Sequence, residues 1–276
     1  MQHQVLNDLF WLKDRAEEMP VLFIGHGSPM NAIEDNEFSN YWKNLGKQLP
    51  KPEAILVVSA HWLTKGTLVT ANSTLETIHD FRGFPQPLFD VNYDVQGSPE
   101  LAKDIVKLSL DQHEIHEDLT WGLDHGAWSI LCHLFPEANI PVLQLSIDYY
   151  KGSDYHLEIG RQLKALRKKG VIIIGSGNIV HNLSAIDWKN MNTDNYAYDW
   201  AIESNEIIKN AVLTGDYKSL IDYKNKGVSL QYAIPTPDHY FPLLYTLGLV
   251  NKNDNVHIFN DKYVGGSLSM TSFLFG

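Results

Sequence analysis

The segment Val171-Ile172-Ile173-Ile174, which Gly175-Ser176-Gly177 follows, decides the fold. A run of β-branched residues that ends at glycine is typical of a strand buried on both faces of a sheet. Three further short apolar runs have the same character: Val21–Ile24, Ala54–Val58 and Val142–Ile147. Because strands buried on both faces belong mainly to parallel sheets, these runs predict a largely parallel central sheet.

Helical patterns alternate with these runs. They cover Glu100–Leu110, His156–Lys169 and Asp194–Thr214, and the last two stop at or near a glycine. Two C-terminal segments, Asn255–Phe259 and Ser267–Phe273, are predicted strands at an edge of the sheet, where an antiparallel orientation is allowed. The pattern predicts an α/β fold, in which a central mostly parallel or mixed sheet is flanked by helices.

No linker or internal repeat divides the chain, so residues 19–276 are expected to form a single domain. Residues 1–18 carry apolar side chains from Val5 to Leu12 at a roughly helical spacing. They are predicted to form an N-terminal helical extension that packs on the domain or on a second subunit.

The composition limits the classes of molecule to which the chain is expected to bind. The chain has 276 residues and a formal net charge of −11, which disfavours nucleic acid and anionic membrane surfaces. No apolar run reaches the about 18 residues of a spanning helix, and the single cysteine, Cys132, excludes an internal disulfide. The N-terminus lacks the pattern of a signal peptide. A cytoplasmic monomer or small homo-oligomer that acts on a small molecule is therefore expected.

Histidines follow the predicted strands. His26, His61 and His181 each come after one of them, directly or within a few residues, and His239 lies in a proline-rich loop that begins a helix. Parallel strands bring such residues to one edge of the sheet, where ligands of α/β folds bind. A single histidine there is more often a packed polar residue than a ligand. Four together favour a site for zinc or iron at the carboxyl edge of the strands.

A fifth histidine, His125, stands at the start of an apolar helix that runs to Leu134. It is a candidate general acid or base, or a group that binds an oxyanion. The alternative is an exposed histidine beside a helix cap that Asp124 supplies.

Two other patterns do not support a function. Gly175-Ser176-Gly177 lacks the third glycine of the dinucleotide fingerprint, because Val180 occupies its place. The segment His113–Glu117 has its histidines three residues apart, whereas the zinc-protease helix needs four. That segment is predicted to be a solvated connection between a helix and a strand.

A set of short motifs resembles the 4,5-DOPA dioxygenase extradiol family, a branch of the class III extradiol ring-cleaving dioxygenases. They span nearly the whole chain, and their order is more specific than any one of them. The motifs are Gly25-His26-Gly27-Ser28-Pro29, Ser59-Ala60-His61-Trp62, Asp80-Phe81-Arg82-Gly83-Phe84-Pro85, Gly97-Ser98-Pro99-Glu100-Leu101, Leu123-Asp124-His125-Gly126-Ala127-Trp128, Gly175-Ser176-Gly177-Asn178 and Pro237-Asp238-His239-Tyr240.

The resemblance implies that residues 19–276 form a catalytic domain that opens the ring of a DOPA-like catechol with O₂ at one metal ion. It places His26, His61 and His239 as metal ligands, and His181 as either a further ligand or a base. His125 corresponds to a catalytic acid–base or oxygen-binding histidine. In the implied mechanism, His181 takes the second catechol proton and His125 protonates the oxygen as the O–O bond breaks.

Two details of the resemblance bear on the metal and the substrate. His239 stands where better-studied catechol members have a carboxylate, unless the neighbouring Asp238 turns inward. Fe(II) is expected for ring cleavage, and a histidine-rich site is also compatible with Zn(II). The expected pocket walls are aromatic, with core packing as the alternative for each: Trp62, Phe81, Phe84 and Trp128.

Two other classes of protein use the same features. A zinc hydrolase would activate water at an open metal position and would act without oxygen. A regulatory protein on the same fold would bind metal and a partner but have no turnover. The presence of both His125 and His181 favours an enzyme over the regulatory protein.

Overall fold

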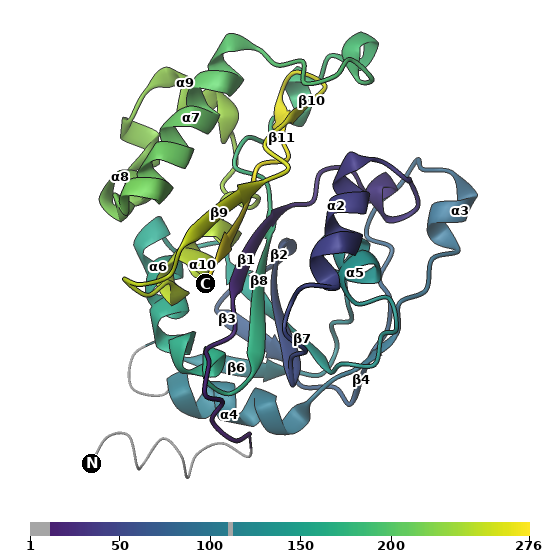
Figure 1. Cartoon of the computed structure of the whole chain (residues 1–276), viewed down its shortest axis with the longest axis vertical. Coiled ribbons are helices and arrows are strands. Elements are labelled where there is room, and N and C mark those ends of the chain that lie inside the picture. Colours follow the sequence, from purple (N-terminus) through teal and green to yellow (C-terminus); the bar gives the residue numbers. More distant parts are fainter. Residues whose placement is uncertain (1–11, 110–112) are drawn as a thin grey trace.

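The structure is a computed structural model that describes residues 12–109 and 113–276. Its centre is an eight-stranded mixed sheet in the order β6-β3-β7-β2-β8-β1-β12-β9 (Figure 1). The strands are β1 (Val21–Gly25), β2 (Ala54–Thr64), β3 (Thr67–Thr70), β6 (Ile115–Asp118), β7 (Val142–Asp148), β8 (Val171–Gly177), β9 (Val256–Phe259) and β12 (Ser272–Phe275). The four central strands β7, β2, β8 and β1 are parallel, as predicted from the apolar runs.

The edges of the sheet are antiparallel. On one side β12 pairs antiparallel with both β1 and β9, and on the other β3 pairs antiparallel with β7 and parallel with β6. Short two-stranded sheets join β4 (Thr74–Leu75) to β5 (Val95–Gln96) and β10 (Tyr263–Val264) to β11 (Leu268–Ser269). The prediction of a single α/β domain with a mixed sheet is confirmed.

Helices cover both faces of this sheet: α6 and α10 lie on one face and α2 and α5 on the other (Figure 1). The helices are α2 (Glu37–Gly46), α3 (Gln86–Phe89), α4 (Pro99–Ser109), α5 (His125–Leu134), α6 (Ser153–Leu163), α7 (Asp199–Thr214), α8 (Tyr217–Ile221), α9 (Val228–Ala233) and α10 (Phe241–Leu249). Among the described residues, no helix has the length and apolar character that crossing a bilayer requires.

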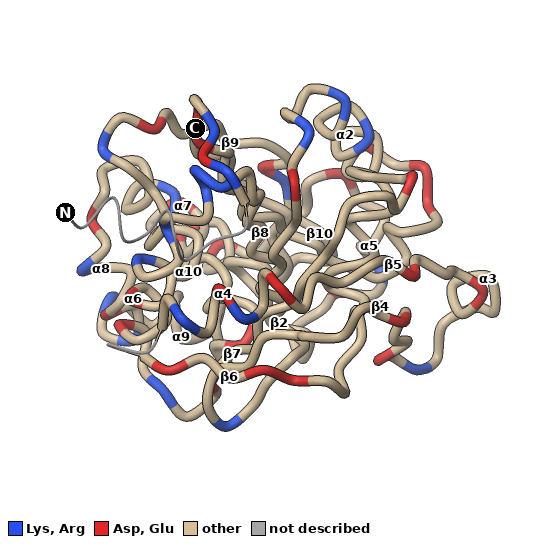
Figure 2. Tube along the Cα trace, turned by 90° about the horizontal axis from the view of Figure 1, so that it is seen from below, with Lys and Arg blue, Asp and Glu red and all other residues tan. Residues whose placement is uncertain are grey.

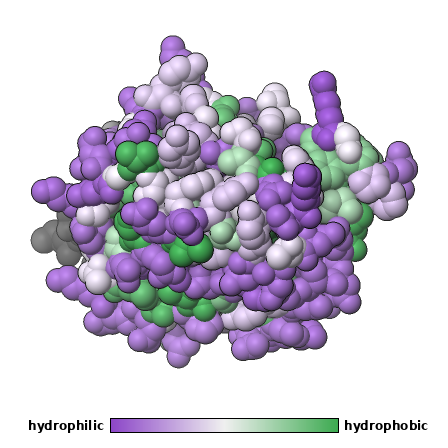
Figure 3. Space-filling view, turned by 90° about the horizontal axis from the view of Figure 1, so that it is seen from above, coloured by the Kyte–Doolittle hydropathy of each residue, from purple (hydrophilic) through white to green (hydrophobic). Residues whose placement is uncertain are grey.

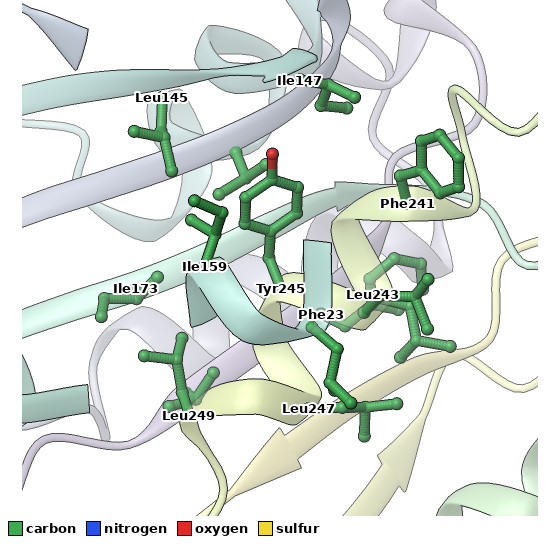
Figure 4. Packing of buried hydrophobic residues seen from close by; sticks show 14 of the residues in the cluster. Phe23, Leu145, Ile147, Ile159, Ile173, Phe241, Leu243, Tyr245, Leu247 and Leu249 are labelled. Atoms are coloured by element: carbon green, nitrogen blue, oxygen red, sulfur yellow. The ribbon is translucent and has the colours of Figure 1, made fainter. Parts of the chain in front are cut away.

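The central strands are apolar throughout because both of their faces are buried. In β1, Val21 and Phe23 belong to one core cluster, and Leu22 and Ile24 belong to the other. Figure 4 shows the first cluster, where residues of α10 lie against strand residues such as Phe23. Burial on two faces explains why these strands have continuous apolar runs rather than an alternating pattern.

Several predicted boundaries differ from the structure. The strand predicted to end at Val58 continues to Thr64, with a shift of register between Val58 and Leu63, so His61 lies inside β2. The helix predicted over His156–Lys169 is α6 followed by a 3-10 turn at Lys164–Arg167. The helix predicted from Asp194 begins only at Asp199, because the preceding chain turns through Asn195 at a φ of 53°.

The C-terminal prediction is partly wrong. The segment Ser267–Phe273 is not one strand but contains the whole of β11 and the start of β12, because the chain turns at Met270 and Thr271. The strand β12 lies inside the sheet, so of the two C-terminal strands predicted at an edge only β9 is there.

The predicted N-terminal helix is wrong for its described part. Residues 12–18 form no helix. The backbone amide of Arg15 instead donates to Lys168 O at 2.7 Å, and Met19 N donates to Arg167 O at 3.0 Å. Pairing with the chain before β8 satisfies these donors, so an internal helical ladder is not needed. The rest of the predicted helix, residues 1–11, lies outside the described residues.

The segment His113–Glu117 is only partly the predicted connection, because Ile115–Asp118 forms the edge strand β6. Its His116 and Glu117 are exposed, as expected for solvated side chains.

Elsewhere on the surface, basic and acidic residues are interspersed over the face in Figure 2. The opposite face, in Figure 3, is mostly hydrophilic, with apolar surface at its right-hand edge, the side on which α3 lies in Figure 1, and in patches on its left half.

Candidate metal centre

The structure brings the predicted histidines together beyond the carboxyl ends of β1, β2 and β8. His26 follows β1 directly, His61 lies near the end of β2, and His239 precedes α10. The ring centroids of these three are 5.1, 5.3 and 5.0 Å apart, in the order His26–His61, His26–His239 and His61–His239. Imidazoles that bind one ion at about 2.0–2.1 Å hold their centroids roughly 5 Å apart, so this triangle fits a common ion.

The backbone around Gly177 explains how chain segments so far apart in sequence meet. His26 N donates to Gly177 O at 3.1 Å, and Asn178 N donates to His239 O at 2.9 Å. A Cβ atom at Gly177 would lie 2.1 Å from His239 O, so only glycine permits this approach. The end of β8 therefore holds the backbones of two candidate ligands.

Hydrogen bonds determine which nitrogen of His26 carries the proton. The Ser176 hydroxyl donates to Gly126 O at 2.5 Å, so its oxygen can only accept from His26 Nδ1, which is 2.9 Å away. His26 Nε2 is then unprotonated, and it lies 3.2 Å from Nε2 of His61. A lone pair that points at another imidazole nitrogen suits a cation between the two rings.

The same logic applies to His239. Its Nδ1 is 2.5 Å from Asp238 Oδ2, and a carboxylate can only accept. Nε2 of His239 is therefore unprotonated as well. Asp238 thus bonds to the ring of its neighbour instead of replacing it, and carboxylates in this position orient a ligating histidine and raise its basicity.

His181 has a different relation to the cluster. Its ring is stacked on that of His239, with centroids 3.5 Å apart and planes 6° from parallel. Potential ligand atoms of His181, Asp238 and His239 lie within 4.8 Å of one another. An ion bound by an imidazole lies in the plane of that ring, however, and two stacked parallel planes do not meet. His181 and His239 cannot both bind the same ion in this arrangement.

Burial keeps these rings neutral. Burial first, and then the charges of neighbouring histidines, hold the pKa of His26 and of His239 well below the ordinary value. Burial lowers the pKa of His61 to about 3, against the opposing effect of Asp80, and the pKa of His181 to about 4, against that of Asp238. Neutral imidazoles are the form that binds a metal ion.

His125 is the first residue of α5 and is only 6% exposed. Asp124 caps this helix by accepting from Ala127 N, as one interpretation predicted, but the expectation of an exposed histidine is wrong. The ring of His125 lies 3.9 Å from that of His61 between centroids. Gly126 allows this contact, because a Cβ there would lie 2.7 Å from a ring carbon of His61.

Asp124 also joins a buried network behind the cluster. Its carboxylate accepts from Ser59 Oγ at 2.6 Å and from the Gln144 side chain. Burial and the nearby Asp80 carboxylate raise the pKa of Asp124 to about 6, although the bond from Ser59 opposes this shift. The network fixes the start of α5, and with it His125.

Asp80 is a site residue to which the sequence alone assigned no role. Its Oδ1 accepts from the backbone N of His125 at 2.9 Å. The same oxygen lies 2.9 Å from His125 Nδ1, and Oδ2 lies 3.7 Å from His61 Nδ1. Burial alone would raise the pKa of Asp80, but its hydrogen bonds and charge contacts with His125 lower it overall. The only signal for Asp80 in the sequence was its place beside Phe81 in a family motif.

The predicted aromatic walls divide into two pairs. Phe81 lies 5.5 Å from the ring of His125 and 5.3 Å from that of Phe84, at the edge of the cluster. Trp128 is fully buried and donates to Ile78 O, and Trp62 is stacked on Trp121 with centroids 5.5 Å apart. The first pair can meet a substrate, whereas the second pair packs in the surrounding structure.

A cavity of about 560 Å³ opens beside the cluster. Gly27, which follows His26, lines it together with Phe84 and the largely exposed Trp188. Its charged lining residues are all acidic, namely Glu34, Glu37 and Asp194. A second cavity of about 550 Å³ lies at the far end of α5. None of the five clustered histidines lines either cavity, and the first one reaches the cluster through Gly27.

Comparison with known proteins agrees with this geometry. Residues 20–275 match the family described as the catalytic LigB subunit of aromatic ring-opening dioxygenase. The chain is 46% identical over 265 residues to the 4,5-DOPA dioxygenase extradiol of Escherichia coli strain K12, covering 95% of this chain and 96% of that relative. It is 36% identical to the protein of the same name from Beta vulgaris, covering 92% and 95%.

A solved structure is similar as well. The crystal structure of an uncharacterized protein, JW3007, from Escherichia coli K12 superimposes with a TM-score of 0.80 at 41% identity and covers 94% of this chain and 100% of that one. The chain belongs to the LigB family of catalytic subunits of aromatic ring-opening dioxygenases. The resemblance found in the sequence is confirmed, and the protein is an oxidoreductase that opens aromatic rings.

Proposed function

We propose that this dioxygenase opens the ring of a catechol with a DOPA-like side chain, at one ion held by His26, His61 and His239. The observation that carries the proposal is the triangle formed by the buried rings of His26 and His239 and the partly buried ring of His61. The partners of Nδ1 in His26 and His239 leave Nε2 of both rings unprotonated. The names of the relatives support the substrate class, since several are 4,5-DOPA dioxygenases.

The donor set suits Fe(II) and Zn(II), because both accept neutral imidazole. Bound Fe(II) would supply a place where catechol and O₂ meet and exchange electrons. In the overall reaction the ring supplies four electrons, one ring C–C bond beside the diol breaks, and both oxygen atoms enter the semialdehyde product. Three protein ligands leave positions open for this chemistry, whereas four would close a structural site.

We assign the proton transfers to the two remaining histidines. His181 has a lowered pKa and stacks outside the triangle, so its ring is free to take a proton from a catechol hydroxyl. His125 lies on the other side, against His61, and is placed to return a proton to oxygen as the O–O bond breaks.

The remaining parts of the site bind and shield the substrate. Phe81 and Phe84 form an apolar wall that excludes water and can contact the flat ring. The cavity beside Gly27 would take the side chain. Glu37 and Asp194 pair with Lys262, so Glu34 is the lining carboxylate that suits the ammonium group of an amino-acid or amine substrate.

The test is an anaerobic loading experiment. Apoprotein is loaded with Fe(II) without oxygen, mixed with DOPA, dopamine, protocatechuate or catechol, and then exposed to air. A yellow ring-opened product with one O₂ consumed per catechol is expected. Absence of O₂ uptake across the panel would disprove the proposal, and ester hydrolysis by the zinc form without oxygen would favour the hydrolase instead.

A further inference from the structure

Asp80 lies in the loop between β4 and α3, and that loop is fastened to the start of α5. The backbone N of Ile78 donates to Leu123 O at 2.8 Å, and Trp128 Nε1 donates to Ile78 O at 2.9 Å. These bonds fix the chain two residues before Asp80. The carboxylate, 18% exposed, is therefore presented to the histidine cluster by a held backbone.

The carboxylate of Asp80 faces two rings at once. Oδ1 is 2.9 Å from His125 Nδ1, and Oδ2 is 3.7 Å from His61 Nδ1. The ion pairs of Asp80 within the described residues involve these two histidines and no lysine or arginine. The bond from the backbone N of His125 to Oδ1 keeps the carboxylate in this place.

The chemistry of a carboxylate determines the consequence. The contact is an ion pair and not an aligned hydrogen bond, since Nδ1 of His125 has no hydrogen-bond partner among the described residues. The negative charge 2.9 Å away still disfavours a lone pair on Nδ1 and favours a proton there. The same field favours Nδ1–H on His61. With Nδ1 protonated, Nε2 of each ring would be free for other partners. Nε2 of His61 faces Nε2 of His26 at 3.2 Å, and a bound cation would be needed to hold these two bare nitrogens together.

We propose that Asp80 is a positioning residue that fixes the tautomer of the metal-ligating His61 and of the acid–base His125 together. The inference rests on the proposed function for the roles of the two histidines. Asp238 and Ser176 make the corresponding contacts with Nδ1 of His239 and of His26. Within the described residues, Asp80 contacts both a candidate ligand, His61, and the candidate proton donor, His125.

The first test measures metal affinity, which needs no turnover. Zn²⁺ is titrated into apoprotein against a competing chelator, and Asp80→Asn is expected to weaken binding about 10–100-fold. The matched control is Asp94→Asn, between α3 and β5, whose carboxylate accepts from Thr77 N at 2.9 Å and has no described ion pair with the cluster. Its affinity is expected to stay within twofold of wild type.

The second test observes the tautomers directly. In zinc-loaded protein with ¹⁵N-labelled histidine, the rings of His61 and His125 should carry hydrogen on Nδ1. Asp80→Asn should shift the ring-nitrogen signals of both and leave those of His26 in place. If Asp80→Asn does not fold, Asp80→Glu, which keeps the charge one methylene further out, is used for both measurements.

The outcomes separate this inference from the proposed function. Wild-type zinc affinity with unchanged ring-nitrogen signals in the Asp80 variant would overturn the positioning role, as would an equal loss in Asp94→Asn. If no catechol is opened by the Fe(II) protein but Asp80→Asn still weakens zinc binding and shifts both rings, the proposed function fails and the positioning role stands.

Discussion

The imidazole rings of His181 and His239 lie stacked, with centroids 3.5 Å apart and planes only 6° from parallel. From the sequence, His181 could be either a fourth ligand or a base. Because an ion lies in the plane of each imidazole that binds it, stacking favours a base beside a three-histidine site. Measurements of metal binding and turnover can therefore tell whether four histidines close the site around zinc or three leave positions open for substrate.

Replacement of the two stacked histidines should therefore separate metal binding from turnover. His239→Ala is expected to weaken Zn²⁺ binding by more than the about 10–100-fold that loss of an outer partner costs. His181→Ala should bind Zn²⁺ nearly as wild type but lower kcat of the Fe(II) enzyme about 10²–10⁴-fold, as loss of a general base does. Chelator competition and O₂ uptake measure the two effects. A similar loss of zinc affinity in both variants would instead make His181 a ligand.

Gly177 offers a test of how the site is assembled. In Gly177→Ala the new Cβ would meet His239 O at 2.1 Å, and the bond from Asn178 N to that oxygen would be strained. Overpacking of this kind costs about 1–3 kcal/mol of unfolding free energy. Displacement of His239 should also weaken zinc binding, measured by the same competition assay.

The control for this change is Gly66→Ala. Gly66 has a φ of 84° and no atom within 4 Å of a new Cβ, so the cost is backbone strain of about 1 kcal/mol with no effect on the site. Equal zinc affinity in the two glycine variants would show that Gly177 does not set the position of His239.

Local patterns in the sequence predicted the parts of the molecule that depend on local physics. The strand β8 is apolar because both of its faces are buried, and this is visible in the sequence alone. His26 could be placed because it follows such a strand directly. His239 could be placed only by the resemblance and its proline-rich loop, since the contact of its carbonyl oxygen with Gly177 joins segments 62 residues apart.

Other features depend on contacts that no local pattern contains. The roles of Asp80 follow from partners across the fold, at His61 and His125, and the loop that carries it has no periodicity. The extension of β2 through His61 includes Trp62, which is buried by stacking on Trp121. Residues 12–18, the described part of the predicted N-terminal helix, instead pair through Arg15 N with the backbone of Lys168. In each case a tertiary contact outweighed a local preference.

Glu34 tests the substrate assignment. It lines the cavity beside Gly27, and no ion pair is described for its side chain. Glu34→Gln should raise KM for dopamine about threefold to fivefold, since an exposed ion pair contributes up to about 1 kcal/mol. KM for catechol, which has no side chain, should not change. Steady-state O₂ uptake gives both values.

Asp35→Asn is the control for Glu34, because Asp35 is its neighbour but pairs with Lys43 at 3.0 Å and does not line the cavity. A parallel rise in KM for dopamine and catechol in Glu34→Gln, or the same rise in Asp35→Asn, would exclude a role for Glu34 in binding the ammonium group.

The burial of His156, away from the metal site, predicts that the stability of the protein depends on pH. It is fully buried on α6, where Nδ1 lies 3.1 Å from Tyr245 OH, and burial lowers its pKa to about 3. In the unfolded chain its pKa is near 6.5, so between these values the unfolded state binds a proton that the folded state does not. The contribution of neutral His156 to the free energy of unfolding is therefore fully present above pH 6.5, and it is lost as the pH falls toward 3.

His156→Gln keeps a hydrogen-bonding group beside Tyr245 but does not titrate. It should be less stable than wild type at pH 7 because packing on Phe241 is lost, and it should lose about 2 kcal/mol less between pH 6.5 and 4.5. Urea unfolding at several pH values, on metal-free protein, measures the two curves. His116→Gln, at an exposed position on β6, serves as the control. Parallel curves for His156→Gln and wild type would mean that burial of His156 does not oppose its protonation.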